Sequence, residues 1–199
     1  MKPILMSTPM VRAILQGRKR QTRRVIRLKS KPDLLVYGGR NWRDKDIYEF
    51  EGDGYYVERV KSRFQVGDSL YVREGMFKNQ EDEYGYMADE PDWKLWEYTG
   101  IPSIHMHKAA ARIFLRVTNV RVERLWQITE DDALAEGVRR FETKPDATYG
   151  YDKSTVFFEF PHYAFQYLWD SINAKRGYPW DSNPFVWVIS FERIEKPVG

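Results

Sequence analysis

The sequence predicts an α+β protein: a small, mostly antiparallel β-barrel with a few helices at its periphery. In the stretch 110–125, apolar and polar side chains alternate as in a long, half-buried strand that bends near Asn119. The stretch 185–191 is almost entirely apolar, which predicts a central strand. Helix signals are confined to three main segments, namely 8–17, 128–137 and 161–175. Short strands with a few helices packed at their ends are typical of a small barrel.

The chain begins with a short apolar segment, 2–6, that predicts a strand, and a helix is expected over 8–17. Thr8 is placed to cap the first turn, and Pro9 loses no hydrogen bond that the helix needs. Gly17 can adopt the left-handed conformation that ends a helix. Four side chains at helical spacing would form its apolar face: Met10, Val11, Ile14 and Leu15.

A dense basic segment follows Gly17, and a strand over 25–28 is expected to carry this basic turn into the sheet. No acidic residue occurs in 1–32. Cations that leave a fixed helix end together suggest an anion-binding site, whereas the plain alternative is a solvated charged face. The five basic residues of the turn are Arg18, Lys19, Arg20, Arg23 and Arg24.

Two insertions are expected to interrupt the barrel. The first, at about 30–63, is rich in loop signals and predicts an irregular segment with one strand over 54–60. A buried strand over 69–73 then ends at Glu74. The second insertion, at about 76–104, is rich in aromatic and acidic residues.

The segment 128–137 predicts a second capped helix. Thr129 and Asp132 match a capping signature, and Gly137 is placed to end the helix. Glu136 falls in the last turn, where the helix dipole disfavours an anion. Its carboxylate therefore requires either solvent or a cationic partner.

The composition of the chain excludes several kinds of functional site. The chain has 199 residues, a formal net charge of +3 and no cysteine, which excludes disulfides, thiolate metal sites and a cysteine nucleophile. We expect one cytoplasmic domain over 1–199, with no membrane segment and no cofactor. His105 and His107 could share a strand face, but no third ligand stands nearby, so we expect them to line a pocket or pack rather than bind a metal.

Several segments together resemble a known family. They are Gly17-Arg-Lys-x-x-Thr-x-Arg24 within the helix and turn 10–24, the stretch 66–72, the helix 128–137, the stretches 168–173 and 183–187, and the closing strand. With them the chain resembles the ASCH family of the PUA-like β-barrel superfamily, and in particular its longer phage and prophage-type members. The family fold would be the barrel without the two insertions.

The resemblance implies binding of RNA or a nucleotide in a basic cleft beside the barrel. Some small members hydrolyse the amide of N4-acetylcytidine, and a few relatives are ribonucleases. Lys19, Thr22 and Glu136 stand at the positions that match the catalytic residues of the amidohydrolase branch. Arg20 departs from the motif, which usually has threonine there. The candidate nucleic-acid or substrate-binding residues are Arg18, Arg20, Arg23, Arg24 and Glu74.

Lys19, Thr22 and Glu136, which we call the triad, leave two chemical interpretations open. Burial and crowding by arginines would lower the pKa of Lys19, so that a neutral lysine takes a proton from Thr22 or from water. Glu136 would pass a proton to the leaving amine or orient it. If Glu136 instead pairs with Lys19, the lysine stays charged and the site is a binding contact. The function classes are therefore a hydrolase of a modified nucleoside or of RNA, a non-catalytic RNA- or DNA-binding module, and a phage accessory protein that binds another protein through 80–98. The sequence indicates no oligomeric state.

Overall fold

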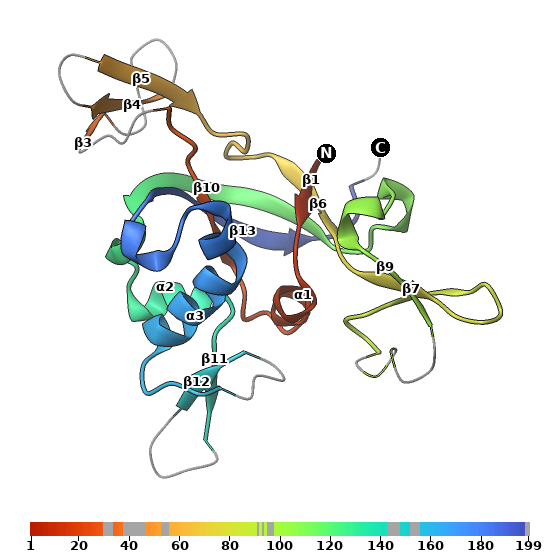
Figure 1. Ribbon diagram of the computed structural model, residues 1–199. Helices are drawn as coiled ribbons and strands as arrows, with labels where there is room; N and C mark the ends of the chain where they lie inside the picture. The colour runs from red at the N-terminus through yellow and green to blue at the C-terminus, as the bar shows by residue number, and fades with distance from the viewer. Residues whose placement is uncertain are drawn as a thin grey trace.

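The computed structural model has a mixed α+β architecture with mostly antiparallel sheets (Figure 1). It describes residues 1–29, 34–37, 47–52, 56–90, 92, 94, 98–142, 148–151 and 156–197 of the chain. None of the helices in these ranges is long and apolar enough to span a membrane.

The main sheet has five strands in the order β1-β6-β10-β13-β2. Its strands are β1 (Lys2–Leu5), β6 (Ser69–Arg73), β10 (Phe114–Arg124), β13 (Phe185–Ile194) and β2 (Gln21–Val25). Only the β1–β6 pair is parallel. The strand predicted over 69–73 is confirmed, as is the central position of the closing strand. No pairing of β1 with β2 occurs in the described strands, so closure of the sheet into a barrel stays a prediction.

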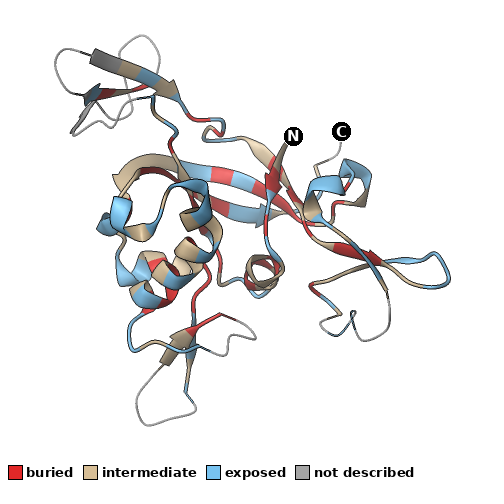
Figure 2. Cartoon of the chain, viewed as in Figure 1, coloured by how far each residue is buried: buried red, intermediate tan, exposed pale blue. Residues whose placement is uncertain are grey.

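The two longest strands, β10 and β13, pair with each other in the main sheet and run through the middle of the molecule (Figure 1). Their register shifts between Val117 and Asn119, which confirms the bend predicted there. Leu115, Val117 and Ile189 are almost fully buried along this pair. Buried positions recur along the central strands of the ribbon (Figure 2). The core therefore lies against the middle of the sheet.

Helix α1 (Thr8–Leu15) connects β1 to β2. Its N-cap is Ser7 rather than Thr8, because the chain turns helical one residue earlier than the sequence suggests. Ser7 makes no side-chain capping bond. The predicted apolar face is confirmed, since Val11 and Ile14 are buried and Met10 and Leu15 pack against the same core. Gly17 has a φ of +74° and ends the helix as expected.

Part of the basic segment forms the strand β2, which holds Arg23 and Arg24, while Arg18, Lys19 and Arg20 lead into it. The prediction of a separate strand over 25–28 was therefore wrong. Residues 21–25 pair with Val186 to Ser190 of β13. Backbone pairing with a central strand outweighs the low strand propensity of this charged segment. As a result, its side chains alternate between two faces rather than clustering in one turn.

The first insertion is a three-stranded antiparallel sheet of β3 (Leu34–Tyr37), β4 (Ile47–Gly52) and β5 (Tyr56–Lys61). For these described residues the expectation of a mainly irregular segment was wrong. Strand β5 covers 56–60 of the strand predicted over 54–60, and 54–55 lie outside the described ranges. The aromatic side chains of β4 dock on the main sheet. The ring of Phe50 lies 4.9 Å from that of Phe185, and Tyr48 packs in the same edge-on manner against Trp187.

The second insertion also forms a small sheet, ordered β8-β7-β9. Its strands are β7 (Met76–Lys78), β8 (Tyr84–Tyr86) and β9 (Thr99–Ile101). Arg12 of α1 donates hydrogen bonds to the carbonyls of Met87 and Ala88, which join this insertion to the N-terminal helix.

Helices α2 (Glu130–Ala135) and α3 (Pro161–Asn173) pack together beside the sheet (Figure 1). The predicted cap of α2 is confirmed, because the Asp132 amide donates to Thr129 Oγ1 at 3.1 Å. Of the stripes predicted on α3, Phe165 and Trp169 are buried, whereas Tyr163 and Tyr167 are exposed. The remaining elements are the 3₁₀ turns η2 (Ser103–His105), η3 (Lys108–Ala110), η4 (Leu125–Gln127), η5 (Ala174–Arg176) and η6 (Trp180–Ser182), and the hairpin strands β11 (Arg139–Phe141) and β12 (Thr148–Gly150).

Candidate functional site

Lys19 and Glu136 form a buried ion pair between the segment that enters β2 and the end of α2. The Lys19 Nζ lies 2.8 Å from Glu136 Oε2 and 2.9 Å from the backbone carbonyl oxygen of the same residue. The two side chains are 0% and 2% exposed. The cationic partner that the sequence required for Glu136 is therefore Lys19.

Gly137 allows this close approach of α2 to α1. Its φ is +103°, and a Cβ atom there would lie 2.9 Å from the Ala13 Cβ and 3.4 Å from the Lys19 Cβ. The Arg20 amide also donates to the Ala135 carbonyl at 2.8 Å. Backbone contacts on both sides of the ion pair thus fix the distance between Lys19 and Glu136.

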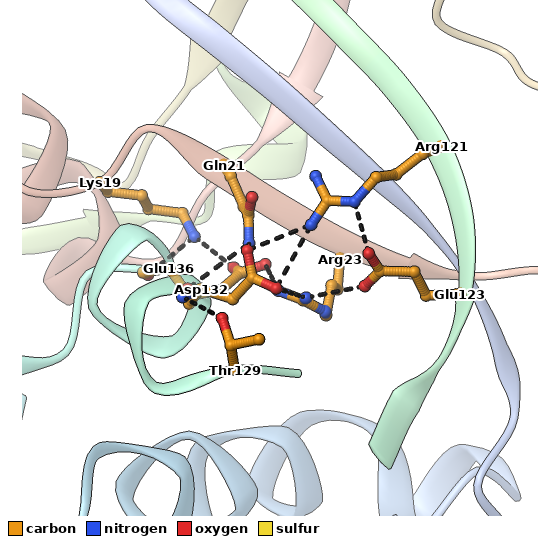
Figure 3. Close-up of polar contacts among 8 residues, drawn as sticks. All are labelled: Lys19, Gln21, Arg23, Arg121, Glu123, Thr129, Asp132 and Glu136. Atoms are coloured by element: carbon orange, nitrogen blue, oxygen red, sulfur yellow. Dashed lines mark hydrogen bonds and ion pairs between the residues drawn. The ribbon is translucent and has the colours of Figure 1, made fainter. Parts of the chain in front are cut away.

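Arg23 extends the pair into a larger cluster (Figure 3). Its guanidinium lies 3.3 Å from Glu136 Oε1, 2.8 Å from Asp132 Oδ2 and 3.0 Å from Glu123 Oε2. Arg121, next to Glu123 on β10, donates to both Glu123 and Asp132. Both carboxylate oxygens of Glu136 consequently have a cationic partner.

Gln21 completes the face of β2 that contacts α2. Its side-chain amide donates to Asp132 Oδ1 at 2.9 Å. Lys19, Gln21 and Arg23 alternate along the chain and share this face (Figure 3). The alternation explains how one short segment supplies three polar contacts to one helix.

Opposing effects act on the protonation of this cluster. Burial lowers the pKa of Lys19 below its usual value, and this effect exceeds the opposing attraction of Glu136. Arg24 and Arg23 lower the Lys19 pKa further, which agrees with the predicted crowding by arginines. For Asp132, burial raises the pKa, but bonds from Gln21, Arg23 and Arg121 outweigh it and leave the pKa lowered.

A pocket of about 250 Å³ opens between β2 and α3, and Thr22 and Glu136 both line it. We call it the Thr22 pocket. Its polar wall also includes Arg23, Arg24, Arg27, Asn173 and Arg176, and its apolar wall Met10, Val25, Phe165, Leu168, Trp169, Ile172 and Tyr178.

The triad is thus only partly gathered at this pocket. Glu136 and Thr22 lie in its wall, while Lys19 reaches it through its contact with Glu136. Thr22 is 2% exposed and sits opposite Ile189 in the β2–β13 pair. The arrangement can hold a small ligand between an aromatic wall and a row of cations, with a carboxylate at its base.

The other predicted binding residues separate into distinct places. Arg24 lines the pocket and donates to the Leu5 carbonyl at 2.7 Å. Arg18 is held near Gly137, to whose carbonyl oxygen it donates at 2.6 Å, and Arg20 is exposed on the other side of the strand entry. The five basic residues therefore do not form one anion site, because Arg23 and Arg24 line the pocket while Arg18 and Arg20 lie outside its lining.

Glu74 is not brought to the pocket. Its carboxylate accepts two hydrogen bonds from Arg112, at 2.9 and 3.0 Å, and it is 1% exposed. Arg112 also pairs with Asp89 and stacks on the Tyr86 ring. This second cluster joins β6 to the second insertion, so its geometry is that of a structural contact.

The prediction that the histidines pack into the protein was wrong. His105 and His107 are both exposed, because 106 alone of this stretch turns inward between two 3₁₀ turns. Within the described ranges, no group of three or more histidine or acidic side chains could hold a metal ion.

Sequence reasoning missed the acidic half of the cluster, Glu123 and Asp132, and the partner Arg121. Asp132 was recognised only as a helix cap, and the two β10 residues only as members of an alternating strand. The i,i+2 spacing of Arg121 and Glu123 places both on one strand face, and that was the available signal. Which helix faces them depends on long-range pairing.

Comparison of the chain with models of protein families, with curated proteins and with solved structures gives no match. The ASCH resemblance therefore depends on the motif residues alone.

Proposed function

We propose that the chain binds a nucleoside, free or within RNA, in the Thr22 pocket and hydrolyses an N4-acylcytidine amide there. The observation that carries this proposal is the shared placement of Thr22 and Glu136 in one pocket wall, with Lys19 2.8 Å behind the carboxylate. The PUA-like barrel and the ASCH family remain part of the proposal.

The pocket chemistry suits a nucleobase. Phe165, Trp169 and Tyr178 supply aromatic surface on which a base can stack. Asn173 can hydrogen-bond the edge of a base, and Arg176 adds a cation at the rim. A pocket of about 250 Å³ is small, which favours a single base over a larger ligand.

The proposed reaction breaks the bond between the acyl carbon and N4. The oxygen of water, or of the Thr22 hydroxyl followed by water, attacks the acyl carbon, and its proton passes to the Glu136–Lys19 pair. The pair returns a proton to N4 as the C–N bond breaks, so cytidine and a carboxylic acid leave. A lowered pKa of Lys19 makes the lysine a better proton donor in this exchange.

A second candidate is a non-catalytic nucleic-acid-binding module. It is favoured by the ion pairs of Glu136, whose two oxygens are already occupied by Lys19 and Arg23. In this alternative the Lys19–Glu136 pair holds α2 against β2, and the pocket only binds a base. The phage accessory and ribonuclease functions have no specific observation in their favour.

The proposal is tested by incubating N4-acetylcytidine and other N4-acylcytidines with the wild-type protein, Lys19→Ala and the surface control Lys2→Ala. We expect cytidine from the wild type and the control, and none from Lys19→Ala. Product from all three at equal rates would exclude Lys19 from the reaction. No product from any protein, together with measurable cytidine binding, would support the binding module. Thermal melting of each variant separates loss of chemistry from loss of fold.

A further inference from the structure

A second cleft, of about 600 Å³, lies between the two end strands of the main sheet, β1 and β2. Its walls come from β1, from the segment around β2 and from residues 60–64, where the first insertion returns to the sheet. We call it the β1–β2 cleft. Arg24 crosses between its walls, because its guanidinium on β2 donates to the Leu5 carbonyl on β1.

The charge of the β1–β2 cleft is of one sign. Five of its described lining residues are cations, and none is acidic. Arg27 and Arg63 are exposed, and the Nε of Arg73 is buried without a hydrogen-bond partner among the described residues. The five cations are Arg24, Arg27, Lys61, Arg63 and Arg73. One-signed clefts concentrate counter-ions of the opposite sign.

The β1–β2 cleft borders the Thr22 pocket, because Arg24, Val25 and Arg27 line both. Its remaining lining is largely apolar and includes Phe64 and Trp187. A ligand that fills the pocket and continues past Arg24 and Arg27 therefore meets further cations beside an apolar floor. An anionic chain with alternating phosphates and planar bases matches both features.

We propose that the β1–β2 cleft binds the phosphates of nucleotides that flank the base in the Thr22 pocket, so that the ligand is a single-stranded oligonucleotide rather than a free nucleoside. The inference rests on the proposed function in one respect, namely that the pocket holds a base. A base can enter such a pocket only when it is unstacked, which a single strand permits. The first insertion then has a defined role, since it supplies Lys61 and Arg63 to the cleft.

The test compares the wild type with a cleft variant, Lys61→Gln/Arg63→Gln, and a charge-matched control, Lys108→Gln/Arg116→Gln, at two exposed cations outside the cleft. The probe is a fluorescein-labelled oligocytidylate of about eight nucleotides, within the length range of single-strand sites. RNA and DNA versions are both titrated at several salt concentrations, with free cytidine as a competitor.

We expect the cleft variant to bind the oligonucleotide about tenfold more weakly than the control. Its plot of log affinity against log salt should also be flatter by about 0.7 per lost phosphate contact. Free cytidine should compete far more weakly than unlabelled oligocytidylate. Equal affinities and slopes in the cleft and control variants would overturn the proposal, as would equal competition by cytidine and the oligonucleotide.

The outcome for the cleft is separable from that for hydrolysis. A protein that turns over N4-acetylcytidine but shows equal oligonucleotide affinity in the cleft and control variants keeps its proposed function and loses the cleft proposal. If the protein shows no turnover but its oligonucleotide binding depends on Lys61 and Arg63, the cleft proposal stands and the proposed hydrolysis fails. A preference for the RNA probe over the DNA probe would assign the strand to RNA.

Discussion

The interpretation of the candidate site depends most on the buried environment of Lys19. It is a cation without solvent contact, and its charge is matched by Glu136 through one carboxylate oxygen and one carbonyl oxygen. Such a pair gives little net stability compared with apolar residues, but loss of one partner leaves the other charge buried. The Lys19–Glu136 pair is therefore costly to break, whether it serves a reaction or only the packing of α2.

Lys19→Met should destabilise the protein by about 3 kcal/mol, because Glu136 would then retain only the longer contact to Arg23. Lys2→Met removes a more exposed ion pair with Asp68 and should cost less than about 1 kcal/mol. Urea unfolding of both variants checks the difference. Equal losses of unfolding free energy in the two variants would contradict the argument that breaking the buried Lys19–Glu136 pair costs more than breaking an exposed pair.

The lowered pKa of Asp132 predicts that the folded protein loses stability in acid. Because this pKa is lowered in the folded state, the unfolded state binds more protons near and below pH 3.8, and stability falls as pH falls through that range. Asp132→Asn should flatten the acid limb of a stability–pH curve and lower stability at neutral pH. Asp131→Asn, at an exposed neighbour on the same helix, is the control and should leave the limb unchanged.

The site forms where α2 approaches α1 and the segment that enters β2, and Gly137 allows that approach. Gly137→Ala should destabilise the protein by about 2 kcal/mol, since it combines a left-handed conformation with a 2.9 Å contact to Ala13. Gly177→Ala is the matched control, because its φ is +86° and a Cβ there would meet nothing within 4 Å. It should cost about 1 kcal/mol. Thermal unfolding that ranks the two equally would contradict the packing argument.

At the level of elements, local signals were sufficient where they specify a local structure. The cap at Thr129, the helix end at Gly17 and the buried strand around Leu70 all follow from short-range chemistry. The strand β2 could not be recognised, because its charged residues have low strand propensity and its pairing partner lies more than 150 residues away. The ion cluster was missed for the same reason, as it depends on that pairing.

For the whole molecule, the structure makes the first insertion part of the core rather than an appendage. Phe50, 1% exposed, packs on Phe185 of the central strand. Phe50→Ala should therefore lower the global free energy of unfolding by about 3 kcal/mol, with fluorescence and circular dichroism reporting one transition. Val66→Ala, at a 65% exposed side chain, should have little effect. A separate early transition in Phe50→Ala would indicate an independently folding insertion.

We propose that Thr22, rather than a water molecule, makes the first attack in the hydrolysis, and this claim is tested most directly by kcat together with ligand affinity for Thr22→Val. Valine keeps the shape of threonine and removes its hydroxyl, so the account predicts loss of N4-acetylcytidine turnover by at least about a hundredfold, with cytidine affinity nearly unchanged. Thr99→Val, at an exposed threonine of β9, should match the wild type in both. Unchanged turnover in Thr22→Val would contradict the claim.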